Sequence, residues 1–213
     1  MSIKSLYKDK KSEIDDILGR FSLVLETYTP EEVLTEMLFC ICTPQTDAHK
    51  GWQAALNIRE RNLIKNSRFS PDYASALKDA GVRFHKTKAK SALKMVNDFS
   101  PPETIIKIRS LIDETDVIKT RNHLAKIIKG WGLKEASHFL RNVGYGHHVA
   151  ILDRHILRRL IDHNIISEIP ETLDKKSYLD IEQKMLQFSK EIDIPMEALD
   201  LLFWYQSKGE FFK

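Results

Sequence analysis

Cysteine is nearly absent from this chain: its 213 residues include two, Cys40 and Cys42, which lie within one apolar run. On a helix these two side chains point in widely different directions. Two ligands also cannot close a tetrahedral zinc site. We therefore expect both residues to be buried free thiols, and we expect no metal site in the chain.

Long apolar segments and a strong excess of one charge are also missing. No run approaches the roughly 20 residues that cross a bilayer, and the segment MSIKSLYKDKKSEIDDILGRF has no secretory hydrophobic core. We therefore expect an intracellular protein, in the cytoplasm or nucleoid, with no membrane partner. The 33 lysines and arginines against 30 aspartates and glutamates leave a net charge of +3, which favours anionic partners only mildly.

Alternating strand patterns, internal repeats and low-complexity segments are lacking, whereas helical periodicity recurs throughout. Thr29-Pro30-Glu31-Glu32, for example, combines a capping hydroxyl, a proline and acids in the first turn, which is typical of a helix start. Other helices are predicted over residues 3–20, from 46 or 47 to about 61, and over 70–80, 87–99, from 103, from 120, 133–143, 154–160, 178–188 and 195–205. We predict an all-α protein of about ten to twelve helices.

The segment Lys129–Leu160 combines a tight turn with two well-placed charges. Gly130 and Gly132 precede Lys134, and Asp153 follows nineteen residues later, after an apolar stretch. A glycine-containing turn between helices predicts a helical hairpin. On the second helix the apolar side chains share one face, and Lys134 lies almost opposite that face. The turn also leaves backbone N–H groups at a helix N-terminus, where they can bind a phosphate oxygen.

Spacing alone leaves two interpretations of this segment open. In the first interpretation, Lys134 belongs to a corner between helices with solvated charges, and Asp153 serves only as the N-cap of the following helix. In the second interpretation, the positive end of the helix dipole disfavours a charged amine at Lys134. A partly buried neutral amine is a nucleophile of the kind that forms Schiff bases.

Gly130-Trp131-Gly132-Leu133-Lys134-Glu135-Ala136, followed by Leu152-Asp153-Arg154-His155, resembles the helix-hairpin-helix DNA glycosylases. Within that superfamily the chain is most similar to the compact archaeal-type (type-2) 8-oxoguanine DNA glycosylase/AP lyases. The resemblance implies two helical subdomains flanking a cleft, with the hairpin followed by a catalytic-aspartate loop. We expect about residues 30–118 to form one subdomain. Residues 1–29 with 119–213 would form the other, which carries the hairpin (119–144) and the C-terminal base-reading segment.

The resemblance also implies a role for each charge. Lys134 matches the lysine that attacks C1′ of the damaged nucleoside, expels the base and forms a Schiff base, which permits β-elimination of the 3′ phosphate. Asp153 matches the aspartate that orients the nucleophile and stabilises positive charge on the sugar, a task suited to a fixed anion. One departure is the loop Gly144-Tyr145-Gly146-His147-His148, which lacks the usual Gly-Pro. Relatives of the endonuclease III type carry a four-cysteine iron–sulfur cluster, but no cysteine follows Cys42, so we expect neither that cluster nor another cofactor.

A glycosylase extrudes its target base and reads it by stacking and hydrogen bonds. The resemblance places Phe84 and Trp204 near that base, although each can also be an ordinary core aromatic. It gives Lys213 and its carboxylate a part in recognising 8-oxoguanine, at an end of the chain that Phe211 and Phe212 would anchor.

Contacts with the rest of the duplex are expected from other segments. The loop from Thr43 to Asp47 resembles the one from which these enzymes insert a side chain into the gap left by the flipped nucleotide. Gln45 is the predicted inserted residue, and a plain turn is the alternative. Gly130, Gly132 and His155 are predicted to contact DNA, and the alternative for His155 is an ordinary histidine in the first turn of a capped helix. A basic run either follows phosphates or forms a solvated face: Arg83, His85, Lys86, Lys88 and Lys90.

The leading hypothesis is a bifunctional DNA glycosylase/AP lyase that excises 8-oxoguanine through a Schiff base on Lys134. We expect it to act as a monomer on double-stranded DNA that contains an oxidised base. One alternative is an oxidised-pyrimidine glycosylase/AP lyase of the same superfamily. The other is a non-catalytic hairpin module that binds DNA, although such a module has no need of Asp153.

Overall fold

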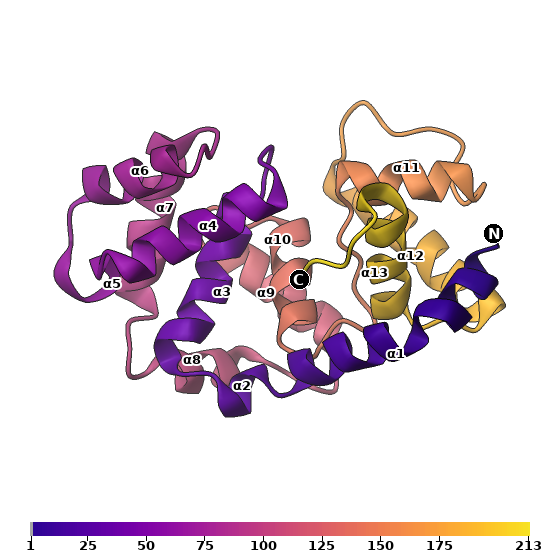
Figure 1. The fold of residues 1–213 in the computed structure, drawn as a ribbon, viewed down its shortest axis with the longest axis horizontal. Helices are drawn as coiled ribbons and strands as arrows, with labels where there is room; N and C mark the ends of the chain where they lie inside the picture. The colour runs from indigo at the N-terminus through magenta and orange to yellow at the C-terminus, as the bar shows by residue number, and fades with distance from the viewer. Residues whose placement is uncertain (1) are drawn as a thin grey trace. The chain divides into compact units, whose positions relative to one another are not determined.

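The computed structural model describes residues 2–213, and within that range its regular elements are all α-helices (Figure 1). They are α1 (Ile3–Ser22), α2 (Val24–Thr27), α3 (Pro30–Cys42), α4 (Ala48–Glu60), α5 (Leu63–Asn66), α6 (Ser70–Asp79), α7 (His85–Asp98), α8 (Thr104–Leu111), α9 (Val117–Ile127), α10 (Leu133–Asn142), α11 (Arg154–Asp162), α12 (Lys175–Ile192) and α13 (Met196–Lys208). The predicted all-α class is confirmed. The count exceeds ten to twelve because the described residues also contain two four-residue helices, α2 and α5.

Local capping groups determine several helix starts. At α3 the Thr29 hydroxyl accepts the Glu32 N–H while the Glu32 carboxylate accepts the Thr29 N–H, which completes a capping box. The predicted start at Thr120 is wrong. Asp116 caps α9 by accepting the Lys119 N–H, so the helix begins at Val117. Thr120 lies inside α9, where its hydroxyl accepts the N–H of the earlier residue Asp113 at 2.8 Å.

The helices form two compact units, unit 2 (Val24–Phe139) and unit 1 (the segment up to Leu23 together with Leu140–Lys213). The predicted division placed the whole hairpin with the terminal segments, whereas α9 and the start of α10 belong to unit 2. Contacts within that unit explain the difference. The fully buried Arg121 of α9 donates to Ser137 of α10 at 3.4 Å, and the hairpin turn packs on Ser91 of α7.

Unit 2 is built around α3, which packs against α4, α7 and α8. Every residue of α3 from Val33 to Cys42 is buried, so this helix forms the centre of the unit. The prediction that Cys40 and Cys42 are buried thiols outside any disulfide is confirmed. Burial raises the pKa of the Cys42 thiol to about 12, so this thiol stays protonated.

Unit 1 is built around α13, which packs against α1, α11 and α12. After α10 the chain turns at Gly144, whose φ is +91°. A Cβ at this position would lie 2.7 Å from Ser22 Cα, so only glycine fits. This glycine makes the turn toward Asp153 in a loop that lacks the usual proline.

Candidate active site

Lys134 lies in the first turn of α10 with 21% of its side chain exposed. Its Nζ donates to Thr43 Oγ1 at 3.1 Å and forms an ion pair with Glu135 Oε1 at 3.0 Å. The Thr43 hydroxyl donates its own proton to the Cys40 carbonyl at 3.0 Å, so its oxygen acts as acceptor toward the amine. Two oxygen partners therefore fix the position of this amine.

Glu135 connects the amine to the hairpin turn. Its Oε2 accepts the Gly132 N–H at 2.9 Å, as a carboxylate at the third helical position commonly does. The Gly132 N–H therefore already has a partner. The N–H groups of Leu133, Lys134 and Glu135 donate to no backbone carbonyl within residues 2–213, so they are the donors that the helix start leaves open to an anion.

Both sides of α10 are buried. The predicted apolar face is confirmed, since Ala136, Phe139 and Leu140 are fully buried. The side expected to be solvated is buried as well, with exposures of 7% or less at Glu135, Ser137, His138, Arg141 and Asn142. The interpretation of the hairpin as a corner with solvated charges is therefore wrong, because these polar groups lie inside the fold.

Gly130 makes the turn into α10 with φ +91°. A Cβ at this position would lie 2.8 Å from Ser91 Oγ and 2.9 Å from Ser91 Cβ. No other residue fits between the turn and α7 without displacing one of them. The glycine predicted to shape the hairpin is thus required by both its conformation and its packing.

Gln45 and Phe84 also belong to unit 2, and both have left-handed backbones, with φ of 53° and 57°. Gln45 is exposed at a turn, and Phe84 is 56% exposed with the Arg83 guanidinium 5.5 Å from its ring centre. Phe84 is therefore no core aromatic. One alternative for the basic residues from Arg83 to Lys90 was a solvated face. This interpretation is wrong for Lys88, which is only 8% exposed.

Asp153, in unit 1, is the N-cap of α11, and its predicted capping role is confirmed. Its Oδ1 accepts the N–H groups of His155 and Ile156 at 2.8 and 2.9 Å. Its Oδ2 accepts no hydrogen bond from residues 2–213 and so remains available to a substrate. The cap thus holds the carboxylate in place and leaves one oxygen open.

The backbone that leads to Asp153 is anchored by two α12 side chains that the sequence did not reveal. Glu182 Oε1 accepts the Ala150 N–H at 2.8 Å, and the Tyr178 hydroxyl donates to the Ala150 carbonyl at 2.5 Å. These partners stand 32 and 28 residues away in the chain. The only sequence signal was an acid within the apolar pattern of α12.

His155 and Trp204 face each other in unit 1, with ring centroids 5.3 Å apart and nearly perpendicular planes. Burial lowers the pKa of His155, and the Asp153 charge opposes that shift. Trp204 is half-buried, and its indole N–H donates to no group in residues 2–213. This half-buried tryptophan therefore retains a hydrogen-bond donor with no protein acceptor.

The last residues fold back onto α13, as predicted for an end anchored by two phenylalanines. Phe211 stacks on Tyr205 at 4.9 Å, and Phe212 lies 6.5 Å from Trp204, centroid to centroid. The Lys213 carbonyl oxygen accepts a hydrogen bond from Arg141 Nη2 at 2.5 Å.

Arg141 in turn pairs with Asp200 at 3.7 Å. Burial raises the pKa of Asp200 to about 7, against the opposing effect of the Arg141 charge. This link between Arg141 and the chain end was not predicted from the sequence. The two partners are 72 residues apart, so no local pattern connects them.

The predicted site residues thus divide between the units. Gln45, Phe84, Gly130, Gly132 and Lys134 belong to unit 2, and Asp153, His155, Trp204 and Lys213 belong to unit 1.

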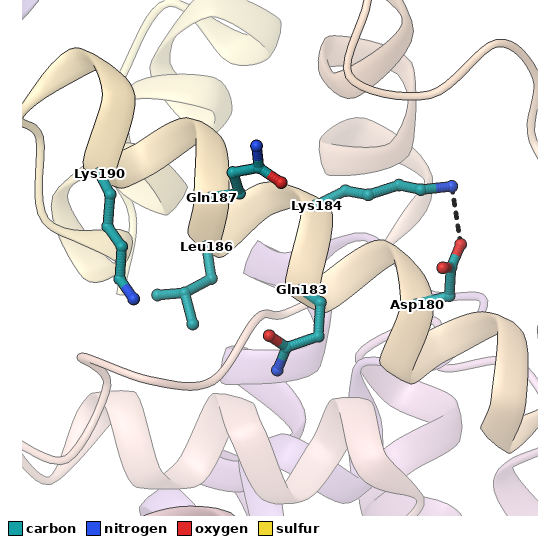
Figure 2. A pocket seen from close by; sticks show the side chains of 6 residues that line it. All are labelled: Asp180, Gln183, Lys184, Leu186, Gln187 and Lys190. Carbon is teal, nitrogen blue, oxygen red and sulfur yellow. Dashed lines mark ion pairs between the residues drawn. The ribbon is translucent and has the colours of Figure 1, made fainter.

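A depression of about 380 Å³ elsewhere on unit 1 follows α12 from Asp180 to Lys190 (Figure 2). Its side chains come from that one helix and include a surface ion pair between Lys184 and Asp180 at 2.7 Å. None of the predicted site residues lines it. Among residues 2–213 no three His, Cys, Asp or Glu side chains are grouped to hold a metal ion, and no helix has the length and apolar character to span a membrane.

Comparisons with known proteins agree with the sequence resemblance. Residues 14–194 match the model of the family described as 8-oxoguanine DNA glycosylase. The chain is 39% identical to an 8-oxoguanine DNA glycosylase/AP lyase of Fusobacterium nucleatum, over 99% of this chain and 96% of that protein. It is 34% identical to the enzyme of the same name from Methanocaldococcus jannaschii, over the full length of both. A crystal structure of the M. jannaschii 8-oxoguanine glycosylase/lyase with a 15mer DNA containing 8-oxoguanine superposes with a TM-score of 0.83, at 32% identity and full coverage of both chains.

Proposed function

The chain belongs to the 8-oxoguanine DNA glycosylase family, and from that premise we propose how its residues remove 8-oxoguanine from double-stranded DNA and then cleave the strand. The observation that carries the proposal is the fixed amine of Lys134, held by Thr43 and Glu135 at the start of α10. An amine with a defined position beside open helix N–H groups suits attack on a sugar next to a phosphate.

Lys134 Nζ, in its neutral form, attacks C1′ of the damaged nucleoside. The C1′–N9 bond breaks with its electron pair on the base, which leaves after it takes up a proton. The amine gives one of its two protons to the departing base. The C1′–O4′ bond then breaks with its electron pair on O4′, which takes the second amine proton, and a Schiff base joins Nζ to C1′. Loss of a proton from C2′ expels the 3′ phosphate, and water then releases the lysine.

Asp153 stabilises the positive charge that develops on the sugar during base departure. Its carboxylate is fixed by two backbone N–H groups through Oδ1, which leaves Oδ2 for the substrate. A preorganised anion of this kind needs no reorientation in the transition state. The same aspartate orients the attacking amine relative to C1′.

The other predicted residues bind DNA. Phe84 and Trp204 stack on the extruded base, and Lys213 recognises it by hydrogen bonds. Gln45 fills the gap in the duplex, while Gly130, Gly132 and His155 lie along the phosphate backbone. The protein acts as a monomer inside the cell, and the reaction uses only groups of this chain, without a metal or another cofactor.

Borohydride reduction traps a Schiff base, so it tests the proposal directly. An 8-oxoguanine duplex incubated with the protein and borohydride should give one covalent adduct, and Lys134→Gln should abolish it. Lys129→Gln, an exposed lysine of the same hairpin, serves as the matched control and should leave the adduct intact. No adduct with the unmodified protein, or an undiminished adduct with Lys134→Gln, would refute the proposal. Parallel duplexes with oxidised pyrimidines establish whether 8-oxoguanine is the preferred lesion.

A further inference from the structure

Lys88 of α7 is a buried lysine that the proposed reaction leaves unused. Its Nζ donates to the carbonyls of Cys42 (2.9 Å) and Pro44 (2.7 Å) and to Thr46 Oγ1 (3.2 Å). It forms no ion pair with a carboxylate in residues 2–213, and burial lowers its pKa to about 8. An ammonium surrounded by neutral acceptors is a costly group to bury. Its three acceptors all lie in one short segment, Cys42 to Thr46, which indicates a task beyond packing.

The three acceptors surround the turn that presents Gln45. The Thr46 N–H donates to the Thr43 carbonyl at 3.0 Å, so Pro44 and Gln45 are the central residues of a β-turn. The φ of 53° at Gln45 is one that such a turn normally assigns to glycine or asparagine. A glutamine in this conformation persists only where its surroundings hold it, and such positions concentrate at functional sites.

The same turn touches the nucleophile. Thr43, its first residue, accepts the hydrogen bond from Lys134 Nζ at 3.1 Å. A shift of the turn would therefore move one of the two oxygens that fix the amine. Lys88 fixes the carbonyls of Cys42 and Pro44, which flank Thr43 on both sides.

A third link leads to the exposed aromatic Phe84. Thr46 Oγ1 accepts the Arg83 N–H at 3.3 Å in addition to the Lys88 ammonium. The Lys88 N–H itself donates to the Phe84 carbonyl at 3.0 Å. One lysine thus connects the turn of Gln45, the Thr43 support of Lys134 and the backbone of Phe84.

We propose that Lys88 is a positioning residue: through Cys42, Pro44 and Thr46 it fixes the turn, so that the Gln45 side chain enters the duplex and Thr43 holds the nucleophile. This inference rests on the proposed function. The three acceptors converge on a single ammonium, a geometry that suits the rotatable donors of lysine and not the planar fork of arginine.

Single-turnover excision from an 8-oxoguanine duplex tests the inference with Lys88→Met, Gln45→Ala and the double variant. Loss of charged hydrogen bonds should slow excision by roughly 10- to 100-fold in Lys88→Met. Because Lys88 acts through the turn, the double variant should be no more than about threefold slower than the slower single variant. Lys94→Met, an exposed lysine on the same helix, should stay within about twofold of the unmodified protein.

A 2-aminopurine beside the lesion supplies a readout that a purely structural role would not change. Its fluorescence should rise when the unmodified protein opens the duplex, and Lys88→Met should lose that rise while retaining its circular dichroism spectrum. If Lys88→Met fails to fold, Thr46→Val, which removes one acceptor, should give a smaller loss that is also non-additive with Gln45→Ala.

Two results would overturn the inference: excision by Lys88→Met at the unmodified rate, or losses that multiply in the double variant. Absence of excision by the unmodified protein would instead defeat the proposed function itself, and the role of Lys88 with it.

Discussion

We propose two tasks for Asp153, and a substitution can separate them. Its Oδ1 caps α11, while its Oδ2 accepts no hydrogen bond from residues 2–213. Asparagine also caps helices well, so Asp153→Asn should change the free energy of unfolding by only about 0.5 kcal/mol. The lost charge should slow base excision by about 100-fold or more. Chemical denaturation and single-turnover excision measure the two effects.

The matched control for this substitution is Asp174→Asn, because Asp174 caps α12 in the same manner through the Ser177 N–H at 2.8 Å. It should leave excision unchanged. Equal activity of Asp153→Asn and the unmodified protein would mean that Asp153 serves only as a helix cap.

Lys213 is the second residue whose contacts predict a specific defect. Its carbonyl is held by Arg141, and the neighbouring Phe212 packs near Trp204. Deletion of Lys213 should slow excision of 8-oxoguanine by about tenfold or more, because contacts with the base are lost. Cleavage of a ready-made abasic site needs no base recognition and should change far less. An equal loss of both activities would contradict a base-reading role.

At the scale of the element, the glycines differ in what a Cβ at their position would cost. Gly144→Ala adds a Cβ 2.7 Å from Ser22 Cα at a left-handed backbone, so it should destabilise the protein by about 3 kcal/mol or more. Gly209→Ala has the same backbone strain without a clash, so it should cost about 1 kcal/mol. Gly19→Ala, in α1 with open space around it, should stabilise by about 0.5–1 kcal/mol. Denaturant titration measures the free energy of unfolding of the three variants. A loss for Gly144→Ala no larger than that for Gly209→Ala would contradict the clash with Ser22.

Helices were predictable from the sequence where their start signals are local. The capping box at Thr29 and the caps at Asp47 and Asp153 involve groups within three residues of one another. The short helices α2 and α5 were missed, because a four-residue segment shows no apolar period and α5 has no side-chain cap.

The site was predictable to a lesser extent. Lys134 stands out because a turn of two glycines precedes it. The groups that hold the site in place, Lys88, Glu182 and Arg141, find their partners 46, 32 and 72 residues away in the chain. Only the folded chain brings such pairs together, so no period or motif of the sequence announces them.

At the scale of the whole molecule, the buried Asp200 gives stability a pH dependence. Its pKa is about 7 in the folded protein against 3.8 as the ordinary value, so the folded state binds this proton more tightly. Its contribution to stability is therefore greatest at low pH and is lost as the pH rises from about 4 to about 7. Asp200→Asn removes this dependence, so its melting temperature relative to the unmodified protein should rise by a few degrees from pH 5 to pH 7.5.

An exposed acid provides the control for that comparison. Asp180→Asn, at the surface of α12, should show a constant difference from the unmodified protein over the same range. A constant difference for Asp200→Asn as well would mean that Asp200 is ionised throughout.

The burial of sulfur has a consequence for the conditions under which this enzyme works. Every cysteine and methionine within residues 2–213 is at most 2% exposed: Met37, Cys40, Cys42, Met95, Met185 and Met196. The reactive form of cysteine is the thiolate, and the pKa of Cys42 keeps that group protonated. The oxidants that turn guanine into 8-oxoguanine also react with exposed sulfur. Residues 2–213 expose no cysteine or methionine by more than 2%. With the amine nucleophile that we propose, the enzyme should keep its activity in peroxide while its substrate accumulates.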